Sequence, residues 1–154
     1  MDTNKSTFRQ DKNQLIYTRM LNAPRELVWE VWTTPEHIKE WFGPEGFSLN
    51  PKSFEAGKHW KFTLDGFGQS FDNNIEYLEF VKPTHLVYKH SNGDGTLTFF
   101  VHVSFEDMGQ QTLLTMRSVF ESEELIAELN RKVNAIKGGQ QTLDKLERYL
   151  STIQ

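Results

Sequence analysis

The chain has 154 residues, a length that predicts one domain with its own hydrophobic core. Its net charge of −4 argues against a nucleic-acid partner, because nucleic-acid-binding domains gather lysine and arginine on one face. The absence of cysteine excludes disulfide bonds and thiolate metal sites.

The first segment, residues 1–13, is polar apart from Met1 and Phe8, so ordering it would bury little apolar surface. We expect a flexible N-terminal arm there, followed by a single domain over residues 14–154. The arm has no apolar stretch typical of a signal sequence, and no later segment approaches the roughly 20 apolar residues that span a membrane. The expectation is a cytoplasmic protein without a membrane partner.

The domain is predicted to open with a strand at residues 15–21 and two short helices within residues 23–44. The first helix has apolar residues at helical spacing and Pro24 in its first turn, where proline is tolerated. The second begins at Pro35 and ends at Gly43-Pro44.

Six runs of β-branched and aromatic residues follow, and they predict six further strands. The turn signals between them are Asp65-Gly66, Lys82-Pro83, Asn92-Gly93-Asp94-Gly95 and Met108-Gly109. Alternation along the runs gives a meandering antiparallel sheet with one apolar face, which includes Trp60 and Phe62. The opposite, polar face is predicted to hold His59, Lys61, His102 and Arg117.

One long C-terminal helix is predicted to begin at Ser122, a good capping residue, with an apolar stripe that extends to Leu150. Gly138 and Gly139 interrupt this stripe, and each glycine costs about 1 kcal/mol relative to alanine in a helix. Two explanations stay open. Either the helix breaks at the pair, or another part of the chain comes so close that only glycine fits.

A set of short motifs extends over most of the chain. They are Ala23-Pro24-Arg25-Glu26-Leu27-Val28-Trp29, Thr33-x-Pro35-Glu36-His37, Trp41-Phe42-Gly43-Pro44, Gly57-x-x-Trp60-x-Phe62, Tyr77-Leu78-Glu79-Phe80-Val81-x-Pro83, Leu86-Val87-Tyr88, Val103-x-Phe105-Glu106 and Leu143-Asp144-x-Leu146-x-x-Tyr149-Leu150. In this order they resemble the START and Bet v 1-like (SRPBCC) superfamily, and within it the activator of heat-shock-protein-90 ATPase homologue family. The resemblance implies an α+β helix-grip fold: a curved antiparallel sheet wrapped around a long C-terminal helix, with two short helices after the first strand.

A cavity between sheet and helix is part of what the resemblance implies. Its lining carries over to Trp60, Phe62, Tyr77, Tyr88, Met116, Gly138 and Gly139, with Trp41 and Phe42 near the entrance. For each of these residues ordinary core packing is the alternative. Many relatives have a tryptophan at the position of Gly139 and an aromatic residue at that of His90, so a larger or more polar cavity is expected. His90 is the candidate polar contact, and a solvent-facing strand end is its alternative.

No catalytic, metal or cofactor site is predicted. The five histidines show no pair at metal-ligand spacing, and no serine lies in a nucleophile elbow. No glycine-rich loop for phosphate opens a helix after a strand. A general acid or base would have to be assembled across the cavity, for example from His90 with Tyr88 or Glu79.

Three functions are weighed, and binding of a small, largely hydrophobic molecule in the cavity is the primary prediction. On this hypothesis Gly139→Trp fills the cavity and abolishes binding without unfolding the protein. The second is a protein partner: a chaperone cofactor or stress-response protein that uses the polar sheet face or the corner at residues 41–44. The third is an enzyme that acts on a cavity-bound substrate.

Overall fold

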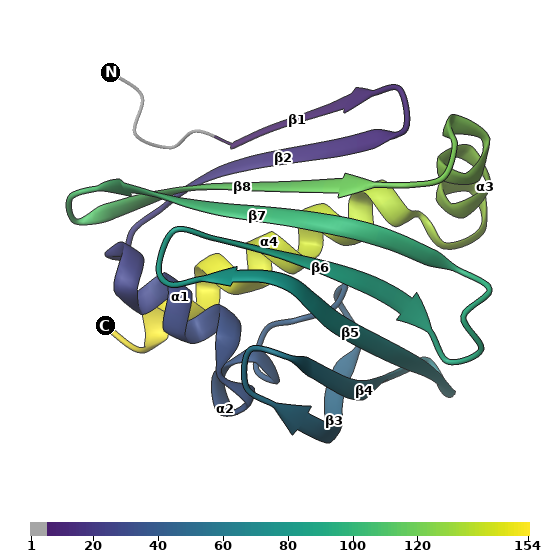
Figure 1. Ribbon diagram of the computed structural model, residues 1–154, viewed down its shortest axis with the longest axis horizontal. Helices are drawn as coiled ribbons and strands as arrows, with labels where there is room; N and C mark the ends of the chain where they lie inside the picture. Colours follow the sequence, from purple (N-terminus) through teal and green to yellow (C-terminus); the bar gives the residue numbers. More distant parts are fainter. Residues whose placement is uncertain (1–5) are drawn as a thin grey trace.

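The computed structural model describes residues 6–154 and shows an α+β fold with one antiparallel sheet of eight strands (Figure 1). The strands are β1 (Ser6–Asp11), β2 (Gln14–Leu21), β3 (Ser48–Glu55), β4 (His59–Gly66), β5 (Gln69–Val81), β6 (His85–Asn92), β7 (Thr98–Met108) and β8 (Gln111–Val119). Their spatial order is β1-β2-β8-β7-β6-β5-β4-β3. The helices are α1 (Arg25–Thr33), α2 (Pro35–Ile38), α3 (Glu123–Val133) and α4 (Ala135–Thr152).

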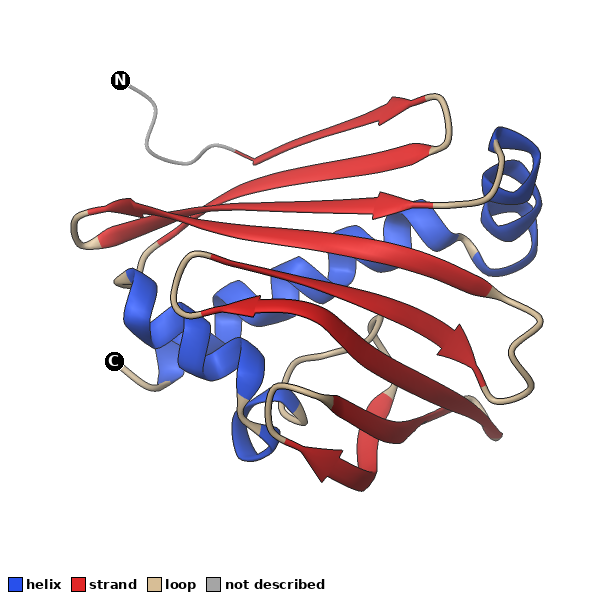
Figure 2. Ribbon diagram, in the orientation of Figure 1, coloured by secondary structure: helices blue, strands red, loops and turns tan. Residues whose placement is uncertain are grey.

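The sheet curves over helix α4, which crosses behind it in Figure 2, while α1 and α3 lie near opposite ends of α4. The predicted α+β class, the curved antiparallel sheet and the C-terminal helix beneath it are therefore confirmed. None of the helices within residues 6–154 is both long enough and apolar enough to cross a membrane.

The N-terminal segment differs from the flexible arm expected over residues 1–13. Residues 6–11 form strand β1, which pairs with β2 so that Phe8 lies opposite Tyr17, with ring centroids 5.0 Å apart. Backbone hydrogen bonds stabilise such an edge strand although its own side chains bury little surface. Residues 1–5 lie outside the described part of the chain. The domain therefore extends at least to residue 6, and α1 and α2 follow the second strand rather than the first.

The prediction of a single C-terminal helix is also wrong, because the chain turns between α3 and α4 at Asn134. This residue has a φ of +54°, a left-handed conformation that asparagine tolerates better than most residues. Helix α4 then continues through Gly138 and Gly139 without a break. The sequence pattern predicted no turn at Asn134, because a single asparagine is a weak helix-stop signal, and the break that was considered lay at the two glycines.

Replacing Asn134 with alanine is expected to lower the free energy of unfolding by about 1 kcal/mol, because alanine adopts the left-handed region less readily than asparagine. Replacement with glycine should not lower it, since the Asn134 side chain makes no capping hydrogen bond to α4. Urea-induced unfolding of the two variants measures the difference. Equal stability of the two variants would contradict the assigned conformation.

The inner face of the sheet is apolar, and one continuous core joins it to α1 and α4. Trp60 and Phe62 face this core, whereas the alternating residues His59 and Lys61 face outward, as predicted. His102 and Arg117 lie opposite one another on β7 and β8, between core residues and therefore on the outer face.

An ion pair connects α4 to strand β2. Arg19 is only 6% exposed, and its guanidinium donates to Asp144 at 2.8 Å and to the carbonyl oxygen of Gln140 at 3.2 Å. Glu147 lies 3.5 Å from the same guanidinium. These contacts hold α4 against strand β2.

Candidate ligand-binding cavity

A cavity of about 480 Å³ lies between the inner face of the sheet, helix α4 and the loop at residues 43–47. Its volume falls within the range of sites that bind small molecules. The lining side chains from the sheet are mostly apolar or aromatic: Leu15, Tyr17, Leu64, Phe71, Tyr88, Phe99, Val101 and Met116, with the polar residues Asn73, His90 and Ser118.

Six of the ten predicted site residues line this cavity: Phe42, Tyr88, His90, Met116, Gly138 and Gly139. The other four pack around it. Trp60 and Phe62 stack on each other with centroids 4.1 Å apart, and Phe42 lies edge-on to both at 5.9 and 5.7 Å. The phenyl ring of Phe42 therefore separates this aromatic pair from the cavity.

Trp41 and Tyr77 also lie away from the cavity. Trp41 is fully buried against Trp32 at 4.8 Å, and its indole N–H donates to the carbonyl oxygen of Val31 at 3.2 Å. The expected position of Trp41 near the entrance is therefore wrong, and its side chain offers no surface to a partner protein. Tyr77 lies edge-on to Tyr88 and to Phe80.

Helix α4 lies close to strand β2 at Gly139. A Cβ atom there would lie 2.5 Å from the hydroxyl oxygen and 2.6 Å from Cζ of Tyr17, whose hydroxyl donates to the carbonyl oxygen of Ile136 at 3.0 Å. A Cβ at Gly138 would meet only Pro44, at an ordinary contact distance of 3.6 Å. Close approach thus explains Gly139 but not Gly138. Gly139→Trp would displace Tyr17 and is unsuitable as a cavity-filling test.

The loop at residues 43–47 is attached to α4 by charged side chains. Nζ of Lys145 donates to the carbonyl oxygens of Gly43 at 3.2 Å and Phe47 at 3.4 Å, and Arg148 pairs with Glu45. Partial burial lowers the pKa of Lys145. These bonds hold the loop over the cavity.

His90 is the main polar group on the sheet side. It is half-buried in the cavity wall, whereas a solvent-facing strand end was the alternative. Its Nε2 lies 2.8 Å from Oδ1 of Asn73, and its ring packs 4.8 Å from Phe99. Burial lowers the pKa of His90 to about 4, so the imidazole is neutral at neutral pH. Burial also raises the pKa of Tyr88, which keeps its phenol protonated.

Among the described residues that line the cavity, no carboxylate makes a hydrogen bond to His90. The two charged lining residues, Glu45 and Lys137, are exposed. Glu79, the predicted acid partner of His90, is exposed and does not line the cavity. Within residues 6–154, no three His, Asp or Glu side chains are grouped as metal ligands.

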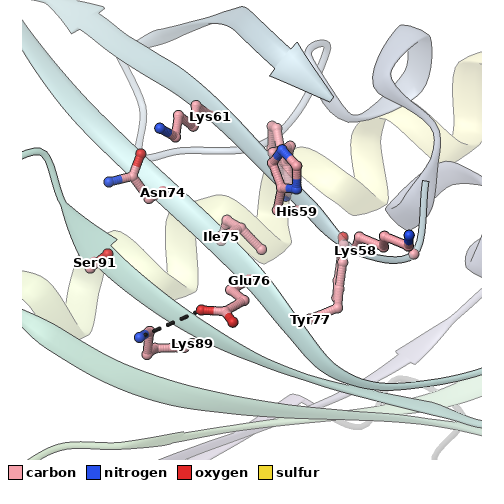
Figure 3. Close-up of a pocket in the computed structure, with 11 residues that line it drawn as sticks. Lys58, His59, Lys61, Asn74, Ile75, Glu76, Tyr77, Lys89 and Ser91 are labelled. Atoms are coloured by element: carbon pink, nitrogen blue, oxygen red, sulfur yellow. Dashed lines mark ion pairs between the residues drawn. The ribbon is translucent and has the colours of Figure 1, made fainter. Parts of the chain in front are cut away.

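A second hollow, of about 550 Å³, lies on the outer face of β4, β5 and β6 (Figure 3). The polar side chains that line it come from neighbouring strands, and Glu76 pairs with Lys89 at 3.5 Å. His59 and Lys61 also lie there. Trp60, Ile75 and Tyr77 also line this hollow, but most of its lining residues are charged or polar, so it is a weaker candidate than the apolar inner cavity.

The lining residues that sequence reasoning missed include Tyr17, Asn73, Phe99, Val101 and Ser118. Alternation offered a signal for some of them. Phe99 and Val101 share the apolar face of β7, and Ser118 follows Met116 by two residues on β8. No local sequence pattern identifies Asn73 as a residue that lines the cavity.

Solved structures of other proteins share this fold. Solved structures that are similar include a protein from Arthrobacter aurescens, with a TM-score of 0.86 and 19% identity over 95% of this chain and 91% of that chain. A Staphylococcus epidermidis protein has a TM-score of 0.81 and 24% identity over 95% and 94%, and protein Ms6760 from Mycobacterium smegmatis has 0.83 and 15% over 97% and 100%. At these low identities the likeness shows the fold alone.

None of the curated proteins matches this chain. The family described as "Activator of Hsp90 ATPase homolog 1-like protein" matches residues 22–151, which include the short helices, the six strands β3 to β8, and nearly all of α4. The motifs quoted from the sequence all fall within this range. The chain therefore belongs to the activator of Hsp90 ATPase homolog 1-like family, and its fold is the helix grip of the SRPBCC proteins.

Proposed function

We propose that this protein binds a small, largely apolar molecule in the cavity between the sheet and α4. The observation that carries the proposal is the cavity itself, about 480 Å³ of space beside a continuous core. Native interiors contain few voids larger than a water molecule, because an empty space forfeits the dispersion contacts of its lining. A ligand that fills the cavity restores those contacts.

The composition of the lining supports binding better than catalysis. Aromatic and aliphatic walls supply contact area, and a few neutral polar groups, His90, Tyr88 and Ser118, are available to orient a ligand. A general acid–base pair would need a partner for His90 that exchanges protons with it. The described cavity places Asn73, an amide, in that position.

A pair of serine-to-phenylalanine variants tests the proposal. Ser118 is 6% exposed and lines the cavity, and its side-chain hydroxyl makes no hydrogen bond within residues 6–154, so Ser118→Phe adds a ring to the cavity without breaking a side-chain hydrogen bond. Ser104 is exposed on the outer face of β7, and Ser104→Phe is the matched control.

The uncharged fluorescent dye N-phenyl-1-naphthylamine is expected to bind the wild-type protein. Ser118→Phe should weaken this binding about tenfold or more, because the added ring occupies ligand volume, whereas Ser104→Phe should leave it unchanged. Fluorescence titration measures both, and circular dichroism checks that each variant is folded. Equal affinities of wild type and a folded Ser118→Phe variant would contradict the proposed site.

A further inference from the structure

The hydrogen bonds around His90 determine which of its ring nitrogens carries the proton. Nδ2 of Asn73 donates to the carbonyl oxygen of Phe71 at 3.0 Å, which fixes the orientation of the Asn73 amide. Its Oδ1, an acceptor, then faces Nε2 of His90 at 2.8 Å. Nε2 must therefore be the protonated nitrogen.

Nδ1 of His90 is consequently an acceptor with a free lone pair. No residue within 6–154 makes a hydrogen bond to it, and Nδ1 is not fully buried. Since burial lowers the pKa of His90 to about 4, the ring stays neutral and Nδ1 stays an acceptor at neutral pH. His90 lines the cavity, so this lone pair is available to a bound molecule.

A flat aromatic wall lies beside this acceptor. The His90 ring is tilted by 30° against Phe99 at 4.8 Å, and Phe99 stacks on Phe120 at 4.7 Å and 15°. Both phenyl rings line the cavity. A planar apolar ring of a ligand would find stacking surface there.

The charges around the cavity disfavour an anionic ligand. Glu45 and Lys137, the charged residues in its described lining, are exposed, and Glu45 pairs with Arg148. A carboxylate buried against His90 would lose its hydration, which costs several kcal/mol, and the one cation in the described lining, Lys137, lies on the exposed rim. The hydroxyl of Tyr88, with no hydrogen-bond partner within residues 6–154, adds a second neutral polar group.

We infer that the cavity selects an uncharged ligand that donates a hydrogen bond to Nδ1 of His90, such as a phenol or alcohol on an apolar ring system. This inference rests on the proposed function and specifies the ligand class for the same cavity. It distinguishes this site from a carrier of fatty acids or other apolar anions.

Three naphthalene derivatives test the inference, since they share one ring system and differ at one position. 2-Naphthol offers a donor, 2-methoxynaphthalene lacks the donor, and 2-naphthoate is an anion. Calorimetric titration of the wild-type protein is expected to show 2-naphthol binding about tenfold or more tightly than the other two, because a site built to pair with a donor rejects analogues without one. In His90→Phe, which keeps the aromatic contact with Phe99, the preference for 2-naphthol over the ether should disappear.

The possible outcomes distinguish a failure of the donor requirement from a failure of the proposed cavity binding. Equal affinities of wild type for 2-naphthol and 2-methoxynaphthalene, or tighter binding of 2-naphthoate, would overturn the donor requirement and leave cavity binding in place. No binding of any of the three would overturn both. The wild-type comparison alone is decisive, so the test does not depend on the folding of His90→Phe. A preference for 2-naphthol that persists in His90→Phe would show that His90 is not the hydrogen-bond acceptor.

Discussion

Trp41→Ala is expected to lower the free energy of unfolding by about 3–5 kcal/mol, the range for truncating a large buried aromatic residue. Trp41 is fully buried, with its ring 4.8 Å from Trp32 and 5.6 Å from Phe42. Its indole N–H also donates to the carbonyl oxygen of Val31. Truncation would leave a void between α1 and the aromatic residues that wall the cavity.

Trp41→Phe serves as the control for this prediction. It retains an aromatic ring but loses the hydrogen bond to Val31, so a clearly smaller loss of stability is expected. Urea-induced unfolding followed by circular dichroism gives both values. A loss of less than about 0.5 kcal/mol for Trp41→Ala is typical of surface substitutions, and would place Trp41 at the entrance instead of in the core.

Gly139→Ala is expected to lower the free energy of unfolding by about 1–3 kcal/mol, the usual cost of overpacking. Its Cβ would overlap the Tyr17 ring, which would have to move away from its hydrogen bond to Ile136 and from Phe8. Gly138→Ala is the matched control. It should preserve stability or raise it by up to about 1 kcal/mol, because alanine favours the helix and the new Cβ meets Pro44 at 3.6 Å.

A double-mutant cycle locates the origin of the Gly139 effect. In a Tyr17→Leu background the penalty of Gly139→Ala should shrink, because the aromatic ring that opposes the new Cβ is gone. Thermal unfolding of the four proteins measures this coupling. Similar destabilisation by Gly138→Ala and Gly139→Ala, or no coupling to Tyr17, would contradict the close approach.

The fold was largely predictable because its signals are local and repeated. Alternating apolar residues such as Trp60 and Phe62 identify a strand and its buried face without reference to the rest of the chain. Strand β1 lacked this signal, since its pairing depends on the backbone of β2. The turn at Asn134 was missed because one left-handed residue leaves little trace in a helical pattern.

The site was predictable only in part, because cavity and core share the same face of the sheet. Tyr88 and His90 line the cavity, while Trp60, two strands away, is covered by Phe42. Alternation assigns all three to the inner face but does not say where side chains stop filling space. The bond between Asn73 and His90 depends on the register of β5 and β6, which no short motif encodes.

A crystal structure of the wild-type protein with 2-naphthol tests the central claim most directly. We expect the naphthalene ring in the inner cavity, between the sheet and α4, with its hydroxyl within hydrogen-bonding distance of Nδ1 of His90. A matched crystal with 2-methoxynaphthalene at the same concentration should show lower occupancy. Naphthol bound in the outer hollow of Figure 3, with the inner cavity unliganded at saturating concentration, would contradict the account.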